Sequence, residues 1–164
     1  MSLVLPTGAV TMITADVRRW GTPGEITVGV ETGGFLLAPP GQNEVSVVAL
    51  AGTNGVLRAP LQFTVSGPAI EALSEWADVR GLRIRTQFHS HRHGYDLSPI
   101  DRVGGIRVEG FITTVIANFA NPEDDPRRWG WWHFHDGGWA LTSAAITVVG
   151  EIQTVTFDED GTRE

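Results

Sequence analysis

The sequence contains no cysteine, and this absence alone excludes several classes of protein. A chain without cysteine has no disulfide framework, no cysteine-ligated zinc and no thiol nucleophile. Positive charge is also scarce, because 12 lysine and arginine residues stand against 19 acidic residues and give a formal net charge of -7 at pH 7. We therefore do not expect nucleic acid, with its negatively charged backbone, to be the main partner.

Long apolar runs are absent as well. No uninterrupted apolar stretch is long enough to cross a bilayer. The first ten residues have no basic segment, and Pro6 and Gly8 interrupt their apolar run, so no signal peptide is expected. These features predict a cytoplasmic protein without a membrane partner. The 164 residues, 41% of them hydrophobic, predict one domain over 1–157, followed by a frayed acidic tail over 158–164.

The most informative stretch of the chain contains two histidines separated by one residue. Residues 82–88 alternate between apolar and polar types, a pattern typical of a half-buried strand. On such a strand the even-numbered residues from Leu82 to Phe88 face one side. His89 and His91 then lie together on the other side, close enough to share one metal ion. Gly94 is expected to end the strand.

A catalytic zinc ion takes three protein ligands and keeps a fourth position for water, so the two histidines need a third ligand. Asp101 is the preferred candidate. Ser98, Pro99 and Asp101 form a typical helix start, with Ser at the N-cap and an acid three positions later. A loop returning this helix to the strand would aim Asp101 at the histidines. Plain capping is the alternative, and His93 is a competing ligand.

Two other metal sites that use His-x-His fit less well. Cupins require a glutamate a few positions further on, and none lies between His91 and Glu109. Amidohydrolases place the pair in a barrel much larger than this chain.

Together these residues resemble the JAMM motif of the JAB/MPN zinc metalloproteases, in particular the bacterial stand-alone, deubiquitinase-like type. That motif is a glutamate, then His-Ser/Thr-His, a short loop and Ser-x-x-Asp. The glutamate usually lies upstream in Glu-x-Gly-Gly-x-Leu, and 31–36 match this form. The resemblance extends from about residue 25 to residue 120. It departs at Arg92, where the family usually has proline, and the loop between His91 and Ser98 is one residue shorter than usual.

The resemblance implies a zinc-dependent isopeptidase or peptidase that cleaves at the C-terminus of a ubiquitin-like protein, by deconjugation or precursor processing. Similar bacterial domains occur beside ubiquitin-like modifiers and their activating enzymes, so E1/E2-like partners from one operon, some of them antiviral, are expected. The alternatives are a zinc metallopeptidase acting on a sulfur-carrier, phage or cell-wall peptide, or a non-catalytic MPN scaffold. Scaffolds typically lose the His and Asp ligands, which are present here.

The residues themselves agree with hydrolysis. Zinc held by His89, His91 and Asp101 would lower the pKa of a bound water to about 7. Glu31 fits the general base, because it lies between apolar runs at 26–30 and 35–37, where a carboxylate is costly unless paired or functional. Gly33 and Gly34 would allow close backbone approach there. An exposed turn glutamate is the alternative for Glu31.

The hydroxyl of Ser98 can donate a hydrogen bond to the oxyanion that develops on a carbonyl under attack. The same hydroxyl can serve as the N-cap of the helix, and the two roles are compatible.

The remaining patterns predict strands separated by one long helix, and so an α/β (α+β) fold of the MPN/JAB type with a mixed sheet flanked by helices. The predicted helix covers 66–79. Predicted strands cover 24–38 (as one strand or a pair), 44–51, 61–65, a buried central strand at 111–119, a hairpin of 131–134 with 139–141, and 145–157.

An aromatic cluster at 129–139 is expected to pack in the core and the hairpin, with a substrate- or partner-binding surface as the alternative. His133 and His135 alternate on the same predicted strand and would allow a second metal site, but no third ligand beyond Asp136 is evident.

Overall fold

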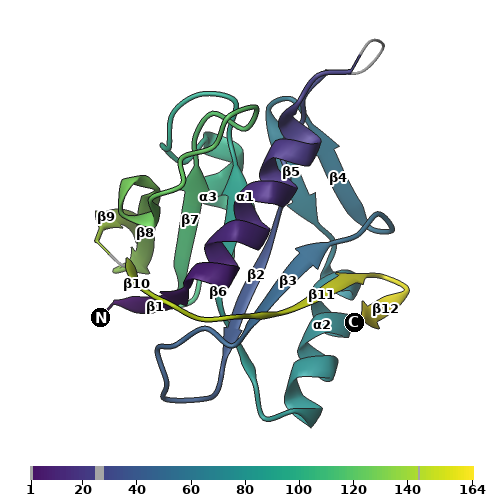
Figure 1. The fold of residues 1–164 in the computed structure, drawn as a ribbon, viewed down its shortest axis with the longest axis vertical. Helices are drawn as coiled ribbons and strands as arrows, with labels where there is room; N and C mark the ends of the chain where they lie inside the picture. Colours follow the sequence, from purple (N-terminus) through teal and green to yellow (C-terminus); the bar gives the residue numbers. More distant parts are fainter. Residues whose placement is uncertain (1, 25–27, 144) are drawn as a thin grey trace.

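An eight-stranded mixed sheet organises the molecule (Figure 1). The computed structural model describes residues 2–24, 28–143 and 145–164. In sheet order the strands are β12 (Gly161–Arg163), β11 (Gln153–Asp158), β3 (Val47–Ala51), β2 (Gly33–Ala38), β6 (Arg83–Ser90), β7 (Ile112–Ile116), β8 (Gly130–His135) and β9 (Gly138–Thr142). The pairs β11–β3 and β6–β7 are parallel, and the other pairs are antiparallel.

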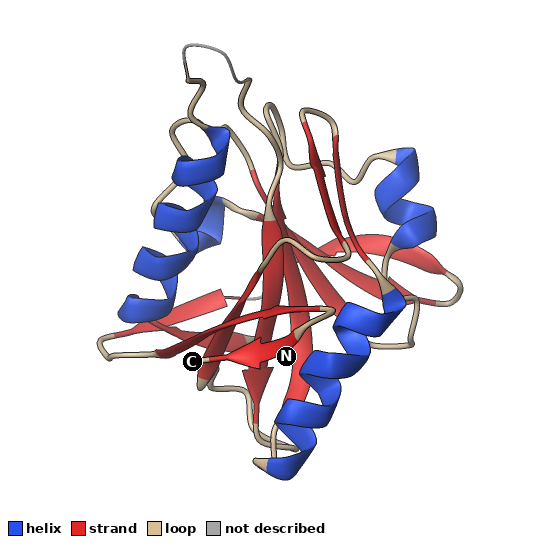
Figure 2. Cartoon of the chain, turned by 90° about the vertical axis from the view of Figure 1, so that its right-hand side faces the viewer, coloured by secondary structure: helices blue, strands red, loops and turns tan. Residues whose placement is uncertain are grey.

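Helices lie on both sides of this sheet (Figure 2). One side carries α1 (Thr7–Gly21), and the other carries α2 (Gly67–Val79) and α3 (Pro99–Gly104). Two small sheets complete the fold: β1 (Leu3–Pro6) with β10 (Ala145–Val148), and β4 (Val56–Ala59) with β5 (Gln62–Val65). A short 3-10 helix covers Pro126–Arg128. Among the described residues no helix has the length and apolar character needed to span a membrane.

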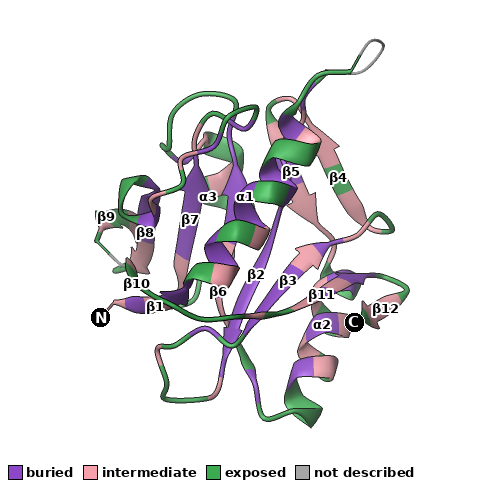
Figure 3. Ribbon diagram, viewed as in Figure 1, coloured by how far each residue is buried: buried purple, intermediate pink, exposed green. Residues whose placement is uncertain are grey.

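The interior of the sheet is apolar on both faces, as the buried β2 shows in Figure 3. Leu36 packs with the α1 residues Ile13 and Val17 in one core. Phe35 and Leu37 point the other way and pack in a second core that includes Leu73 of α2. A strand buried on both faces explains why 33–38 contain almost only apolar residues and glycine.

A β-bulge in β6 distributes its side chains between the two faces of the sheet differently from the prediction. Leu36 pairs with Thr86, but the next residue, Leu37, pairs with Ile84, so Arg85 is an extra residue in the ladder. The bulge reverses the alternation, and Ile84 packs on the α2 side while Phe88 packs on the α1 side. The prediction that all even-numbered residues from 82 to 88 share a face was therefore wrong.

The helix α1 was not predicted. Its N-cap is Pro6, which makes no side-chain cap hydrogen bond, and Gly8 is its second residue. Several β-branched residues follow, so its intrinsic helix propensity is low. Burial stabilises it instead, because Ala9, Ile13 and Val17, at intervals of four residues, are fully buried against the sheet.

The expected strand over 24–38 is shorter in the structure. Only Gly33–Ala38 forms a strand, 28–32 have no regular secondary structure, and 25–27 lie outside the described residues. The predictions for 61–65, 66–79 and 145–157 are confirmed as β5, α2 and the pair β10 and β11. The run at 111–119 forms an interior strand, β7, and the stretch at 131–141 forms the β8–β9 hairpin.

The end of the chain is not frayed. Gly161–Arg163 forms β12, which pairs with β11. The side chain of Asp158 is buried and accepts hydrogen bonds from Arg163, from the backbone N–H of Thr53 and from that of Asp160. The hydrogen bonds from Arg163, together with those from the backbone, hold the pKa of Asp158 well below its usual value despite the opposing effect of burial. The acidic composition of 158–164 suggested a solvated tail, but the side chain of Asp158 is buried and paired with Arg163.

The Arg163→Ala substitution should destabilise the fold by about 1–3 kcal/mol, because it leaves the buried Asp158 carboxylate without its guanidinium partner. Urea denaturation at pH 7 measures the loss. Arg107→Ala is the control, since Arg107 is exposed and makes no hydrogen bond or ion pair with another described residue. Equal stability of the two variants would contradict a structural role for the C-terminal strand.

Candidate metal centre

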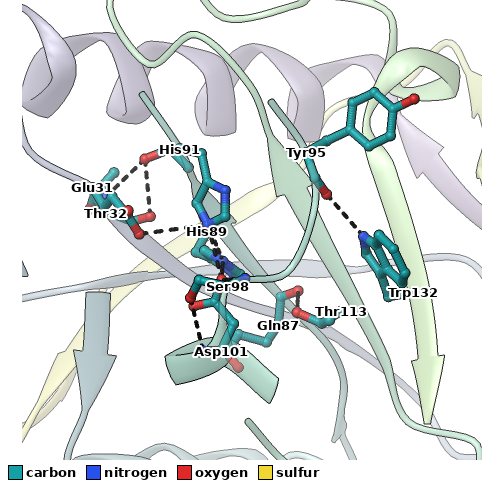
Figure 4. A network of polar contacts seen from close by, with 11 residues as sticks. Glu31, Thr32, Gln87, His89, His91, Tyr95, Ser98, Asp101, Thr113 and Trp132 are labelled. Carbon is teal, nitrogen blue, oxygen red and sulfur yellow. Dashed lines mark hydrogen bonds and ion pairs between the residues drawn. The ribbon is translucent and has the colours of Figure 1, made fainter. Parts of the chain in front are cut away.

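The end of β6 brings the two histidines together, as the sequence predicted. His89 lies in the strand, and His91 follows it immediately, with its N–H donating to Ile116 O of the neighbouring β7. Their Nε2 atoms are 3.1 Å apart. Both side chains are buried, and the two rings lie close to each other (Figure 4).

Asp101 joins the histidines through the capping of α3. Ser98 is the N-cap of this helix: Asp101 N–H donates to Ser98 Oγ, and Ser98 N–H donates to Asp101 Oδ2. That Oδ2 atom also lies 3.2 Å from His89 Nε2 and 3.0 Å from His91 Nε2. Capping and metal binding were weighed as alternatives from sequence, but in the structure one carboxylate meets the requirements of both.

The atoms His89 Nε2, His91 Nε2 and Asp101 Oδ2 have the spacing of zinc ligands. Zinc bonds of about 2.0–2.1 Å in a tetrahedral site place neighbouring ligand atoms about 3.3 Å apart. The observed separations of 3.0–3.2 Å are close to that value. The residues therefore fit a tetrahedral metal ion with two nitrogen ligands and one oxygen ligand.

Glu31 lies beside this set, with its Oε1 atom 3.9 Å from His91 Nε2. Its side chain is buried, and Oε1 has no hydrogen-bond partner among the described residues. Glu31 also forms a compact group with the histidines alone, all ligand atoms lying within 4.8 Å of one another, and this buried group could bind a metal ion. The distances from Asp101 to the two histidines are shorter than the distance from Glu31 to His91, which favours Asp101 as the third ligand. Glu31 then lies outside the set of three ligands.

Opposite pKa shifts separate the two carboxylates. Burial raises the pKa of Glu31 to about 7, against the opposing effect of His91. Burial acts on Asp101 too, but hydrogen bonds with His89 and His91 hold its pKa well below the usual range. Burial alone would lower the pKa of His91, yet its hydrogen bond to Asp101 and the nearby charges raise it. Asp101 is therefore the permanent anion, and Glu31 is able to exchange a proton near neutral pH.

Ser90, between the two histidines, connects β6 to the segment that carries Glu31. Its Oγ accepts from Thr32 N–H at 3.0 Å and donates to Thr32 O, and its own N–H donates to the same oxygen. A Cβ atom on Gly33 would lie 2.3 Å from Phe88 O, and one on Gly34 would lie 2.0 Å from Ala49 O. The expected close backbone approach at the two glycines is confirmed.

Two further polar side chains, those of Arg58 and Asp16, form hydrogen bonds with the side chain of Thr32. Arg58 Nε donates to Thr32 Oγ1, and the guanidinium also donates to the carbonyls of Ala51 and Gly52 and stacks on Trp20. Asp16 is buried nearby, and its Oδ2 accepts a long hydrogen bond from Thr32 Oγ1 at 3.5 Å. Sequence reasoning missed these residues. Asp16 lies on the unpredicted α1, and nothing local in the sequence links Arg58 to Thr32.

The remaining sequence candidates are placed away from the centre. His93 is exposed and is not one of the residues that form the candidate metal centre. His135 forms an exposed group with Asp136 and with Glu109, which sequence reasoning did not connect to it, and His133 is not part of that group.

The aromatic cluster divides between two places. Trp129, Trp131 and Trp132 are buried, which confirms the packing interpretation for them. Each donates its indole N–H to a backbone carbonyl, and the acceptor of Trp132 is Tyr95 in the loop after His91 (Figure 4). Trp139 differs, because it lines a small cavity of about 60 Å³ beside His89 and Asp101.

Similar solved structures place this fold among known ones, although no protein-family model and no curated protein matches the chain. A Desulfitobacterium hafniense protein solved in solution is 17% identical, with a TM-score of 0.63 over 91% of this chain and 94% of that one. A Salinibacter ruber protein is 18% identical, with a TM-score of 0.57 over 88% and 90%. A JAB1/MPN domain protein from Archaeoglobus fulgidus is 12% identical, with a TM-score of 0.51 over 88% and 98%.

These identities are low, so the likeness concerns the fold. The chain has a single-domain α/β fold in which a mixed sheet is flanked by helices, and a JAB1/MPN domain is among its structural neighbours. The fold class predicted from sequence is confirmed.

The Glu31→Gln substitution should stabilise the metal-free protein at pH 8. The folded-state pKa is raised above the ordinary 4.5, so the carboxyl group costs stability as pH rises from about 4.5 to about 7. At pH 8 the gain is up to about 3 kcal/mol, and it disappears below pH 4. Chemical denaturation in the presence of a chelator, at pH 8 and below pH 4, measures this gain in stability. The control is Glu71→Gln, at an exposed position on α2. A Glu31→Gln gain independent of pH would contradict the shift.

The Ser90→Ala substitution should cost about 1–3 kcal/mol, because it removes the buried acceptor of Thr32 N–H. Thermal and urea unfolding measure the loss. Ser46→Ala is the matched control, since Ser46 is exposed and its Oγ makes one long contact of 3.5 Å. If both variants lost the same stability, the contact between Ser90 and Thr32 would have no special importance.

Proposed function

We propose that the chain is a zinc-dependent peptidase or isopeptidase that cleaves at the C-terminus of a ubiquitin-like protein. One observation carries the proposal: three potential ligands converge at the spacing of a tetrahedral site, with a buried carboxylate of raised pKa beside them. His89, His91 and Asp101 would hold the ion, and Glu31 would act on the water.

Zinc, when bound, would polarise the scissile carbonyl and lower the pKa of a water molecule. Glu31 accepts a proton from this water as the water oxygen attacks the carbonyl carbon. When the C–N bond breaks, Glu31 returns the proton to the leaving nitrogen, so one carboxylate serves as base and then as acid. In the metal-free chain burial raises the pKa of Glu31 to about 7, and this effect of burial favours proton uptake by the carboxylate.

Ser98 is the candidate for stabilising the oxyanion. Its Oγ accepts a hydrogen bond from Asp101 N–H, so its hydroxyl hydrogen is not needed for capping. That hydrogen can be donated to the carbonyl oxygen as negative charge develops there. Loss of one such donor typically reduces kcat by about 100- to 1,000-fold.

The substrate class rests on the resemblance of the motif to the JAMM metalloproteases, and a JAB1/MPN neighbour supports it at the level of the fold. A ubiquitin-like protein or its conjugate would be the substrate, and E1/E2-like proteins encoded nearby would be partners. The presence of all five motif residues supports an enzyme over a non-catalytic scaffold.

Metal content and cleavage test the proposal together. The purified protein should contain about one zinc per chain and cleave ubiquitin that is extended at its C-terminus or linked to a second ubiquitin. Glu31→Gln should keep the zinc and lose activity by about 100- to 10,000-fold, because it removes the general base. His89→Ala should lose both, because it removes a ligand.

The matched control is His133→Ala, since His133 is remote from the donor group and should keep full zinc content and activity. A fully active Glu31→Gln variant would show that the base is misassigned. Folded wild-type protein that takes up no zinc, and stays inactive when zinc is added, would rule out the proposed enzyme.

A further inference from the structure

A second cavity, of about 400 Å³, lies next to the metal centre and includes neither His89 nor Asp101 among its lining residues. Its walls come from the end of α1, the segment before Glu31, the β4–β5 turn and the two loops that follow β6 and β7. The lining residues on which the inference depends are Pro23, Val28, Arg92, His93, Asn118 and Phe119.

The cavity is built from the same segments as the metal centre. Arg92 directly follows His91, and Gly29, also on its wall, lies two residues before Glu31. Phe119 N–H donates to His91 O at 3.0 Å, which fixes the cavity wall to the ligand-bearing segment. The cavity and the metal centre therefore share a framework, and in the proposed binding mode a substrate at the centre extends into the cavity.

The chemistry of the walls suits an anion with a small apolar part. Arg92 is exposed and makes no hydrogen bond or ion pair with any other described residue, and the same holds for the imidazole of His93. No acidic side chain among the described residues pairs with this guanidinium, although the chain has 19 acidic residues against 12 lysines and arginines. Guanidinium groups bind carboxylates through paired, charge-assisted hydrogen bonds. Val28 and Phe119 provide apolar surface beside it.

Glu31 indicates which part of a substrate would lie there. In the proposed reaction Glu31 gives its proton to the leaving nitrogen, so the leaving group must depart on the side of Glu31. The 400 Å³ cavity is lined by Val28 and Gly29, which lie just before Glu31 in the sequence, whereas the 60 Å³ cavity is lined by His89 and Asp101. The larger of these two cavities therefore adjoins the segment that carries Glu31, and we place the leaving group there.

We propose that this cavity binds a short leaving peptide by its free C-terminal carboxylate, with Arg92 as the residue that determines specificity. This inference rests on the proposed function and narrows it to removal of a short C-terminal extension. A volume of about 400 Å³ lies in the range of small-molecule sites and holds a few residues of extended peptide. A folded protein linked through a lysine side chain would place no carboxylate there.

Binding is tested first, without any requirement for catalysis. ¹⁵N-labelled wild-type protein is titrated with alanyl-alanine and with its C-terminal amide, and the backbone signals of 92, 93 and 118–121 are followed by NMR. The free acid should shift these signals with an affinity about tenfold higher than the amide. Arg92→Gln should abolish this preference. Arg80→Gln, which removes the same charge at the C-cap of α2, should leave it unchanged.

Cleavage is tested second, on ubiquitin extended by alanyl-alanine with a free or an amidated C-terminus, and on lysine-linked diubiquitin. Wild-type protein should prefer the free acid by about tenfold in kcat/KM, mainly through KM, and should cleave diubiquitin least. Arg92→Gln should raise KM for the free acid to that for the amide with little change in kcat. Arg80→Gln should behave as wild type.

The outcomes separate the two proposals. Carboxylate binding that depends on Arg92, with no cleavage of any substrate, would support the cavity and count against the proposed function. Cleavage with equal preference for acid and amide, or with diubiquitin as the best substrate, would overturn the cavity assignment and leave the function standing. Equal effects of Arg92→Gln and Arg80→Gln would also overturn it, as would the absence of dipeptide binding.

Discussion

The pairing of β2 with the end of β6 is the constraint on which the site depends. The two backbones approach so closely that Gly33 has no space for a side chain, while β3 leaves none at Gly34, and Ser90 fixes the register through Thr32. A shift of one residue in this register would turn Glu31 to the opposite face. Glu31, the proposed general base, is thus positioned by backbone geometry and by the Ser90 hydroxyl, which has no role in the proposed chemistry.

Asp101 is positioned by different means. Its carboxylate completes the N-terminal cap of α3 and at the same time faces both histidines. The capping bond from Ser98 N–H fixes the orientation of Oδ2, so a metal ion would meet a preformed donor. Hydrogen bonds from the two histidines and from Ser98 N–H hold the pKa of Asp101 low against the effect of burial. Burial raises the pKa of Glu31, whose Oε1 atom has no hydrogen-bond partner among the described residues.

Sequence reasoning succeeded where the signal was local. The strand that ends beside His89, the Ser-Pro-x-Asp helix start and the hairpin with its Asp136–Gly137 turn each depend on a few neighbouring residues. It failed where distant contacts decide the structure. The helix α1 has weak propensity and forms by burial, the bulge at Arg85 appears only in the pairing of β6 with β2, and β12 is held by the buried Asp158.

The same division applies to the site. The motif indicated Glu31, His89, His91, Ser98 and Asp101, and the structure brings all five to one place. The supporting residues Asp16, Thr32 and Arg58 could not be found in this way, because they come from three separate segments with no shared spacing in the sequence. The proposed direction of the leaving group likewise rests on two cavities that no sequence motif indicated.

The distribution of the site along the chain also bears on how it forms during folding. His91 and Asp101 are 10 residues apart, and closing so short a loop costs little conformational entropy. The contact of Ser90 with Thr32 spans 58 residues and requires the central strands to pair first. The ligand set can thus assemble within a local segment, whereas Glu31 arrives only with the completed sheet. If the proposed function holds, a partly folded chain would be able to capture a metal ion before it could cleave a substrate, so metal loading would precede the onset of activity.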